Sequence, residues 1–430
     1  MASTHLYEER FIQFGAGGFL RGFADWMIQK LNDRTNFKGS VVVVQPNRPG
    51  KCDNTLAEQN CRYTHIMRGK EGIEKDIINV ISRCVDPYQN FSAFLDLAAN
   101  PAFRYILSNT TEAGIVFCPE DTYSAVPSSF PGKLTRLLKH RFDLRLPGFI
   151  ILPCELIDRN GDELQRCVLQ YAEHWNLGSE FIDWVMAENE FCCTLVDRIN
   201  TGFPTGENIE TDFPDKLINT SEHFHLWVIE TKSDLLSELP FQEAGLNVIV
   251  TQDDLEKYRT RKVRILNGAH TSFTPYGLLE GFNTVGDCMN DPKMRSFICS
   301  CIFEEIIPTL NLPKQELTQY AESVLLRFEN PYIHHKLSDI SLNTVSKFKV
   351  RVLPSILAYK EKYGCYPKNL MFSFKQLLAF YQTDMVNDEP SIVSFMKNHT
   401  TREILGNEAL WGTDLSCLAE ELSYDYTPKR

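Results

Sequence analysis

A short apolar segment followed at once by glycines is the feature that most limits how this chain can fold. Residues 10–14 (RFIQF) predict a β-strand, Gly15, Gly17 and Gly18 follow it, and residues 19–31 place apolar side chains on one helical stripe. A strand, a glycine-rich turn and a helix in this order let backbone amides approach a pyrophosphate at the start of the helix. A tight turn without a ligand is the alternative, which the position after the first strand disfavours.

The segments after this turn continue the same pattern. Residues 40–46 form an almost uniformly apolar, valine-rich run, typical of a central parallel strand that is buried on both faces. Further strands are expected at residues 105–108 and 149–152, and strand–helix alternation of this kind predicts a parallel, doubly wound sheet. From about residue 253 apolar residues recur at helical spacing. We therefore expect an α/β N-terminal domain over residues 1–252 and a mainly α-helical domain over residues 253–430.

Charge and composition exclude several classes of partner. Lys and Arg number 44 against 56 Asp and Glu, a net charge of −12, so the chain has no general attraction to nucleic acid or to an anionic membrane. The N-terminus lacks the apolar core of a signal peptide, and no segment approaches ~20 consecutive apolar residues. We expect a cytoplasmic monomer or small homo-oligomer whose partner is a small molecule. An anionic substrate would need a local basic cluster.

Metal-binding spacings are absent from the sequence. Its 13 cysteines include no Cys-x-x-Cys pair, which favours buried thiols in a reducing compartment. His223 and His225 would share a face only in a strand, and no third ligand pattern accompanies them, so a metal site there is a weak alternative. We expect no metal.

The glycine-rich turn departs from the full dinucleotide-binding pattern at two positions. Leu20 stands where a third glycine is usual, and Gln45 stands where an acid usually binds the ribose hydroxyls. Gln45 can bind ribose without charge, whereas Arg48 leaves a 2′-phosphate possible, so the residues alone leave both NAD and NADP open. The residues expected to hold the cofactor are Gly15, Ala16, Gly17, Gly18, Phe19, Leu20, Gln45 and Asn109.

A lysine, an asparagine and a histidine follow one another near the start of the helical domain. At 100° per residue, Asn267 lies about 140° and His270 about 80° from Lys262, so an α-helix would place all three on one half of its surface. Reduction of a carbonyl group builds negative charge on oxygen. An asparagine amide can hold that oxygen, a histidine can orient it, and a desolvated lysine can supply the proton. A solvated basic turn beside a core histidine is the alternative from this segment alone.

Four stretches together carry a resemblance to a known family. Residues 14–23 (FGAGGFLRGF), residues 194–199 (TLVDRI), the Lys-x4-Asn-x2-His spacing from Lys262 and residues 327–331 (RFENP) are similar to segments of the polyol-specific long-chain dehydrogenases. This mannitol dehydrogenase family contains mannitol 2-dehydrogenases, mannitol-1-phosphate dehydrogenases and hexuronate reductases. The resemblance implies a Rossmann-type N-terminal domain, a helical C-terminal domain, NAD as cofactor and a metal-independent oxidoreductase.

The resemblance also implies roles for single residues. Lys262 would be the general acid and base, Asn267 and His270 would polarise and orient the substrate oxygen, and Asp197 and Arg327 would shape the substrate pocket.

One position departs from the family. Leu156 stands where family members often have an asparagine that donates a second hydrogen bond to the substrate oxygen. Asn160, one turn further on if the segment is helical, is the expected substitute, and Glu155 or a backbone amide are the alternatives.

Two stretches point to a substrate. Residues 153–157 (PCELI) and 224–230 (FHLWVIE) look most like the tagaturonate reductase branch of the family, which implies hydride transfer between tagaturonate and altronate. A uronate carboxylate needs a fixed cation, for which Arg327, Lys347 and Arg351 are candidates, and His335 could reach hydroxyl groups. The alternatives are fructuronate (the substrate of a mannonate-forming reductase), mannitol 1-phosphate, a neutral polyol, or a sensor that binds nucleotide or sugar acid without turnover.

Overall fold

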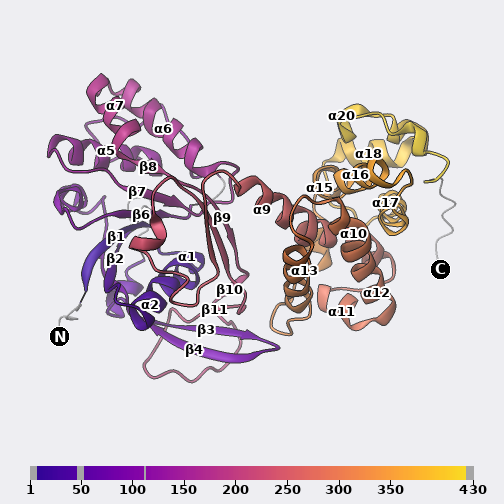
Figure 1. Cartoon of the computed structure of the whole chain (residues 1–430), viewed down its shortest axis with the longest axis horizontal. Coiled ribbons are helices and arrows are strands. Elements are labelled where there is room, and N and C mark those ends of the chain that lie inside the picture. The colour runs from indigo at the N-terminus through magenta and orange to yellow at the C-terminus, as the bar shows by residue number, and fades with distance from the viewer. Residues whose placement is uncertain (1–6, 46–52, 111–112, 423–430) are drawn as a thin grey trace. The chain divides into compact units, whose positions relative to one another are not determined.

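The computed structural model describes residues 7–45, 53–110 and 113–422. The chain forms two compact units, residues 1–255 (unit 1) and residues 256–430 (unit 2). Unit 1 is built on a parallel sheet, and unit 2 consists of helices (Figure 1). Within the described ranges, no helix has both the length and the apolar character needed to cross a membrane.

The main sheet of unit 1 is parallel throughout, with the strand order β5-β2-β1-β6-β7-β8. The expected strands are confirmed, because residues 10–14 lie in β1, residues 40–44 in β2 and residues 105–108 in β6, while β7 begins one residue later than expected. Pro46 lies outside the described residues. The strands are β1 (Glu8–Phe14), β2 (Gly39–Val44), β5 (Ile81–Val85), β6 (Tyr105–Ser108), β7 (Ile150–Pro153) and β8 (Glu190–Phe191).

Alternate side chains of β2 enter two different cores, as expected for a strand buried on both faces. Val41 and Val43 pack in a core with residues of α2, whereas Val42 and Val44 pack in a core with residues of α5, α6 and α7. The doubly wound arrangement is thereby confirmed, with helices on both faces of the sheet (Figure 1). The helices of unit 1 are α1 (Gly18–Gly22), α2 (Ala24–Arg34), α3 (Thr55–Glu58), α4 (Phe91–Leu95), α5 (Phe130–Asp143), α6 (Asn160–His174), α7 (Ser179–Glu188) and α8 (Leu235–Glu238).

The helix expected over residues 19–31 is two helices, because the backbone breaks at Phe23 (φ −127°, ψ −80°). The break seats the Phe23 ring against Phe19 and Trp227, with ring centroids 5.0 and 5.5 Å away. Just before it, a Cβ atom on Gly22 would lie 2.5 Å from the side chains of both Asn200 and Asn219. Gly22, two positions after Leu20, is therefore the glycine that allows close helix packing in this chain.

Two smaller sheets complete unit 1. One has the order β10-β11-β3-β4 and the other the order β13-β12-β9. The second packs its Val196, Trp227 and Ile229 in the same core as α2, so it covers that face of the main sheet. The strands are β3 (Tyr63–Gly69), β4 (Gly72–Ile78), β9 (Cys193–Asp197), β10 (Asn200–Gly202), β11 (Asn219–Ser221), β12 (Leu226–Glu230) and β13 (Val248–Thr251).

Unit 2 is organised around α10, of which residues 268–277 are all buried. A π-helical segment, Lys262–Asn267, leads directly into α10, so the buried helix fixes the position of this segment. The helices from the boundary onward are α9 (Leu255–Arg261), α10 (Gly268–Leu279), α11 (Val285–Asn290), α12 (Pro292–Ser300), α13 (Lys314–Phe328), α14 (Leu337–Ile340), α15 (Thr344–Arg351), α16 (Leu353–Tyr363), α17 (Lys368–Phe380), α18 (Pro390–Asn398), α19 (Thr401–Leu405) and α20 (Glu408–Trp411).

Candidate functional site

A cavity of about 570 Å³ lies in unit 1 beside the carboxyl ends of β1, β2 and β6. The residues expected to hold a cofactor divide between its wall and the adjoining helix. Gly18, Phe19 and Leu20 belong to α1 and are not among the residues that line the cavity. Leu20 is instead buried in the core. The expected residues that do line it are Gly15, Ala16, Gly17, Gln45 and Asn109.

The glycine-rich turn presents bare backbone to this cavity. Gly15 has a φ of +115°, a conformation that favours glycine, and its amide donates to the Val44 carbonyl at 2.9 Å. A Cβ atom on Gly17 would meet no heavy atom within 4 Å, so the space next to this residue is open. These features fit a pyrophosphate group held by backbone amides.

Arg21, which the sequence analysis did not single out, braces the turn. Its Nε donates to the Ala16 carbonyl at 3.1 Å and its Nη1 to the Leu217 carbonyl at 2.6 Å. The guanidinium also lies 5.0 Å from the centre of the Tyr63 ring. Arg21 and Leu217 line the cavity as well, so Arg21 joins the turn to another part of the cavity wall. The sequence signal that could have identified Arg21 is its position within residues 14–23, one of the stretches that resemble the family.

A buried carboxyl group lies beneath the same turn. Gln13 donates from Nε2 to the Gly15 carbonyl at 3.0 Å and to Asp25 Oδ2 at 3.3 Å, and the Tyr63 hydroxyl lies 3.4 Å from the same oxygen. Burial raises the pKa of Asp25 to about 7, although the hydrogen bonds from Gln13 and Tyr63 and the charge of Arg21 oppose the shift. Asp25 therefore holds a proton more readily than an ordinary aspartate.

Replacement of Asp25 by asparagine is expected to flatten the pH dependence of stability. The folded-state pKa is raised from 3.8 to about 7, so the neutral acid stabilises the fold below pH 3.8 and this stabilisation is lost as pH rises to about 7. Between pH 5 and 7 the wild-type free energy of unfolding should fall about 1.4 kcal/mol per pH unit faster than that of D25N. Urea unfolding at pH 5, 6, 7 and 8 measures this slope, and parallel curves would show that Asp25 is ionised throughout.

An acid, Asp53, lies next to Gln45 although it comes nine residues after the end of β2. Gln45 donates from Nε2 to the Asp53 carbonyl at 2.9 Å, and Asp53 is among the residues that line the cavity. Hydrogen bonds from the Thr55 hydroxyl and amide lower the pKa of Asp53, so it is ionised at neutral pH. An ionised carboxylate here can accept hydrogen bonds from ribose hydroxyls and would repel a 2′-phosphate. Arg48 lies outside the described residues.

The carboxyl ends of β6 and β7 are tied together by Glu155. Its carboxylate accepts hydrogen bonds from the Ser108 hydroxyl and from the amide and hydroxyl of Thr110, and burial raises its pKa. Asn109, between these two residues, donates to the Cys154 carbonyl at 2.6 Å. These bonds fix the wall of the cavity formed by residues 109–110.

The expectation for Asn160 is corrected by its contacts. Asn160 is 1% exposed, and its amide donates to the carbonyls of Pro153, Glu155 and Thr194, while its oxygen accepts from the Gly161 and Thr194 amides. All its hydrogen-bonding capacity is used within unit 1, so we assign it a structural role. The preceding residues are not helical, and Leu156 is 65% exposed.

The lysine–asparagine–histidine trio lies in unit 2 with a geometry that differs from the expected α-helix. Lys262 and Asn267 are the first and last residues of the π-helical segment. Hydrogen bonds in a π-helix join residues five apart, so Asn267 lies one wide turn above Lys262 and nearer its face than 100° per residue implies. Such π segments within helices are frequent at functional sites.

His270 lies in the first turn of α10 and is 8% exposed. Its ring centre is 4.3 Å from that of Phe328 and 5.0 Å from that of His335, and Nε2 has no hydrogen-bond partner. Burial holds the pKa of His270 well below its ordinary value, and the charges of His335, Arg327 and Arg351 lower it further. The imidazole is therefore neutral at physiological pH, which suits a group that orients a substrate oxygen.

The expected substrate residues of unit 2 lie near His270 or near its neighbour His335. Arg327, in the last turn of α13, is 5% exposed, and Lys347 on α15 donates from Nζ to the Ile340 carbonyl at 3.0 Å. The charges of Lys347 and Arg351 act on each other and on the two histidines, and burial lowers the pKa of both. In a chain of net charge −12 this is a local basic cluster.

Asp197, the other expected substrate residue, ends β9 in unit 1 and is buried. Its neighbour Arg198 donates to the Gly22 and Glu222 carbonyls and lies 4.3 Å from the centre of the Trp26 ring. These contacts fix Arg198, the residue that follows Asp197, at the end of the strand.

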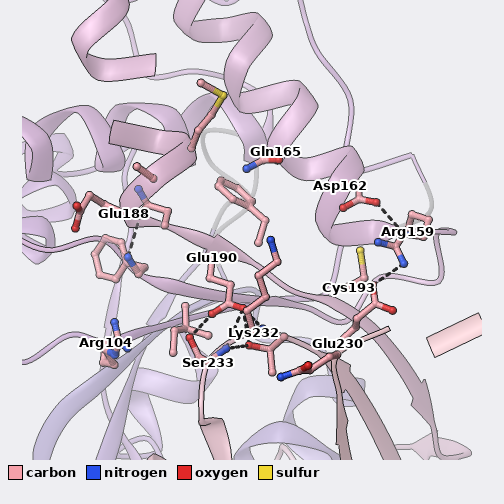
Figure 2. Close-up of a pocket in the computed structure, with 18 residues that line it drawn as sticks. Arg104, Arg159, Asp162, Gln165, Glu188, Glu190, Cys193, Glu230, Lys232 and Ser233 are labelled. Atoms are coloured by element: carbon pink, nitrogen blue, oxygen red, sulfur yellow. Dashed lines mark hydrogen bonds and ion pairs between the residues drawn. The ribbon is translucent and has the colours of Figure 1, made fainter. Parts of the chain in front are cut away.

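A second cavity of unit 1, of about 580 Å³, lies among α6, α7, β8 and the residues after β12 (Figure 2). Its charged groups satisfy one another, because Arg159 joins Asp162 to Glu230 and Glu190 accepts hydrogen bonds from residues 231–233. None of the residues expected from the sequence is among those that line it. We assign no chemistry to this cavity.

The histidine pair His223 and His225 is not arranged as a pair of metal ligands. His225 Nδ1 bonds to the His223 carbonyl, and its Nε2 accepts the Asn247 amide, so both ring nitrogens are engaged. Over the described part of the chain, no three or more His, Cys, Asp or Glu side chains are arranged to hold a metal ion.

Comparison with known proteins covers both units. The model of the mannitol dehydrogenase Rossmann domain matches residues 9–241, and that of the mannitol dehydrogenase C-terminal domain matches residues 254–416. The altronate oxidoreductase of Bacillus subtilis (strain 168) is 44% identical over 434 residues, which span 95% of this chain and 90% of the relative. That of Yersinia enterocolitica (serotype O:8 / biotype 1B) is 39% identical over 450 residues, with 96% and 92% covered.

Two solved structures share the fold. D-sorbitol dehydrogenase in substrate-free form has a TM-score of 0.81 at 20% identity, covering 97% of this chain and 92% of that one. Pseudomonas fluorescens mannitol 2-dehydrogenase, in a ternary complex with NAD and D-mannitol, has a TM-score of 0.67 at 21% identity, with 98% and 91% covered. At these identities the likeness concerns the fold alone.

Proposed function

The chain belongs to the mannitol dehydrogenase family, and from that premise we propose that it is an NAD-dependent oxidoreductase that interconverts tagaturonate and altronate. The observation that carries the proposal is the basic cluster of unit 2, in which Arg327 and Arg351 lie near His270 and Lys347 lies near His335, since a sugar acid needs fixed cations and a neutral polyol does not. The altronate oxidoreductases that match nearly the whole chain support the same substrate.

In this proposal unit 1 binds the cofactor, and unit 2 binds the substrate and transfers the proton. When bound, the nicotinamide cofactor supplies or accepts the hydride. Unit 1 holds its pyrophosphate on the backbone of Gly15–Gly17, and the ionised Asp53 on the cavity wall favours NAD over NADP. The cysteines of the described ranges form no disulfide, which suits a reducing compartment such as the cytoplasm.

Unit 2 handles the proton and the substrate oxygen. Lys262 gives its proton to the alkoxide during reduction and takes it back during oxidation. Asn267 donates a hydrogen bond to that oxygen, and the neutral His270 orients it. Because burial and its cationic neighbours keep His270 neutral, the imidazole is poorly suited to donate the proton, which supports Lys262 as the acid of the reduction.

A panel of substrates and cofactors tests the proposal. NADH oxidation is followed with tagaturonate, fructuronate, fructose and fructose 6-phosphate, and NADPH is compared with NADH for the best of them. We expect kcat/KM to be at least about tenfold higher for tagaturonate than for any other substrate, since loss of a charged contact costs about 1.5 kcal/mol or more. A higher value for fructuronate or fructose 6-phosphate would contradict the substrate assignment. Tight NADH binding without turnover of any keto-sugar would instead indicate a sensor.

A further inference from the structure

The helix that carries Lys262 presents a second set of basic residues along another stripe. Lys257, Arg261 and Arg264 are spaced three to four residues apart, so they lie on one face of α9 and its continuation. With Thr260 and residues 309–312 they line a cavity of about 290 Å³ in unit 2. None of Lys262, Asn267, His270 or the expected substrate residues lines this cavity.

Arg264 lines the cavity and has no carboxylate partner among the described residues. Its Nε donates to the Ser355 hydroxyl at 2.6 Å and its Nη2 to the Thr309 hydroxyl at 3.4 Å, and in the described part of the chain no acid lies within ion-pair distance. Burial lowers the pKa of Arg264 to about 10, so the guanidinium remains charged at neutral pH. A partly desolvated cation that meets only neutral hydroxyl groups gains most from an anion placed beside it.

Arg261 adds a second, more deeply buried donor. It is 5% exposed, and its Nη1 forms an ion pair with Glu316 at 2.5 Å. Its Nε is buried and has no hydrogen-bond partner. The rings of Tyr320 and Tyr258 lie 4.4 and 5.0 Å from the guanidinium carbon and hold it in place. Arg261 therefore adds a second guanidinium, fixed by its ring contacts and its ion pair, to the residues that line the cavity.

The remaining polar groups favour an anion over a cation. Glu256 is the acid that lines the cavity, and its carboxylate oxygens contact Arg259 at 3.4 Å and Thr260 at 3.3 Å. Glu316 is engaged by Arg261. Three cations therefore line the cavity against one acid that has its own partners. The volume suits a compact ligand, since sites for drug-sized molecules begin at about 300 Å³.

We propose that this cavity is a binding site for a phosphate group, either free inorganic phosphate or the phosphate of a small ester. Guanidinium and ammonium groups are donors that phosphate oxygens prefer, and this cavity is lined by two arginines and a lysine, Arg261, Arg264 and Lys257. The site does not depend on the identity of the sugar substrate.

Isothermal titration of the full-length protein with inorganic phosphate tests the proposal. Ionic strength is held constant with chloride, and saturating NADH blocks phosphate binding at the glycine-rich turn. We expect saturable binding that weakens about tenfold or more in both K257Q and R264Q, because each loses a charged contact to the anion. Lys257 is exposed, so K257Q keeps the fold even if R264Q is destabilised.

The matched control is K368Q, which removes one positive charge from the exposed start of α17 in the same unit. Phosphate should bind this variant with wild-type affinity. A titration with glycerol 3-phosphate distinguishes the two possible ligands. Tighter binding of glycerol 3-phosphate than of inorganic phosphate identifies the site as one for a phosphate ester, and equal or weaker binding identifies it as one for free phosphate. No saturable phosphate binding to the wild type, or equal affinity in K257Q and the wild type, would overturn the proposal.

Discussion

Replacement of Lys262 by alanine is expected to lower kcat by about 10² to 10⁴-fold and to leave the affinity for NADH nearly unchanged. The lysine opens the π-helical segment of unit 2, whereas the residues that line the cofactor cavity all belong to unit 1. His270 is a poor replacement for the acid in the reduction, because burial and its cationic neighbours hold its pKa well below the ordinary value and keep the ring neutral. Steady-state kinetics with tagaturonate gives kcat, and quenching of protein fluorescence gives the NADH dissociation constant.

Two further variants separate proton transfer from simple loss of charge. K262R keeps the positive charge but cannot release a proton near neutral pH, so it should be as inactive as K262A. K368A removes an exposed lysine elsewhere in unit 2 and should keep wild-type activity. If K262A retained more than a tenth of the wild-type kcat, another group would have to be the proton donor.

The strands of the main sheet could be predicted because their signal is local. The run of valines in β2 must be buried on both faces, and the structure sends Val41 and Val43 to one core and Val42 and Val44 to the other. The two smaller sheets carry no such signal. Residues 219–221 pair in parallel with residues 65–67, about 150 positions away, so the partner strand rather than the local sequence defines β11.

The break at Phe23 and the π-helical segment were missed for a related reason. Apolar residues at helical spacing predict which face is buried, and Phe23, Met27 and Leu31 are buried as the stripe requires. Over six residues, however, this spacing does not separate a π-helix from an α-helix. The expected angle between Lys262 and Asn267 therefore depended on the wrong helix type.

The candidate site, too, was predictable where its signal is local and not where it depends on contacts between distant segments. The glycine-rich turn and the Lys-x4-Asn-x2-His spacing are local patterns, so both were visible in the sequence. Asn160 was misjudged because its partners come from the ends of β7 and β9, which no local pattern relates to it. Asp25 and Arg21 brace the turn through Gln13, Tyr63 and backbone carbonyls, contacts that exist only once the sheet has formed.

Replacement of Arg327 by alanine is expected to raise KM for tagaturonate by about 10- to 150-fold, which corresponds to about 1.5 to 3 kcal/mol for a lost charged hydrogen bond. Arg327 is 5% exposed and acts electrostatically on His270, so it lies in the basic cluster of unit 2. If it binds the carboxylate of the sugar acid, the loss must depend on that carboxylate. KM for fructose, which has none, should change by less than about threefold in the same variant.

The comparison of the two substrates distinguishes recognition from structural damage. R295A, which removes an exposed arginine paired with Glu329 near the end of α13, should leave both Michaelis constants unchanged. An equal rise for tagaturonate and fructose in R327A would mean that Arg327 supports the fold of the pocket rather than the carboxylate. Unchanged KM for tagaturonate would place carboxylate recognition on another cation of the cluster. Lys347 would be the next residue to replace, since its charge acts on His335 and it lies close enough to Arg351 for that charge to lower its pKa.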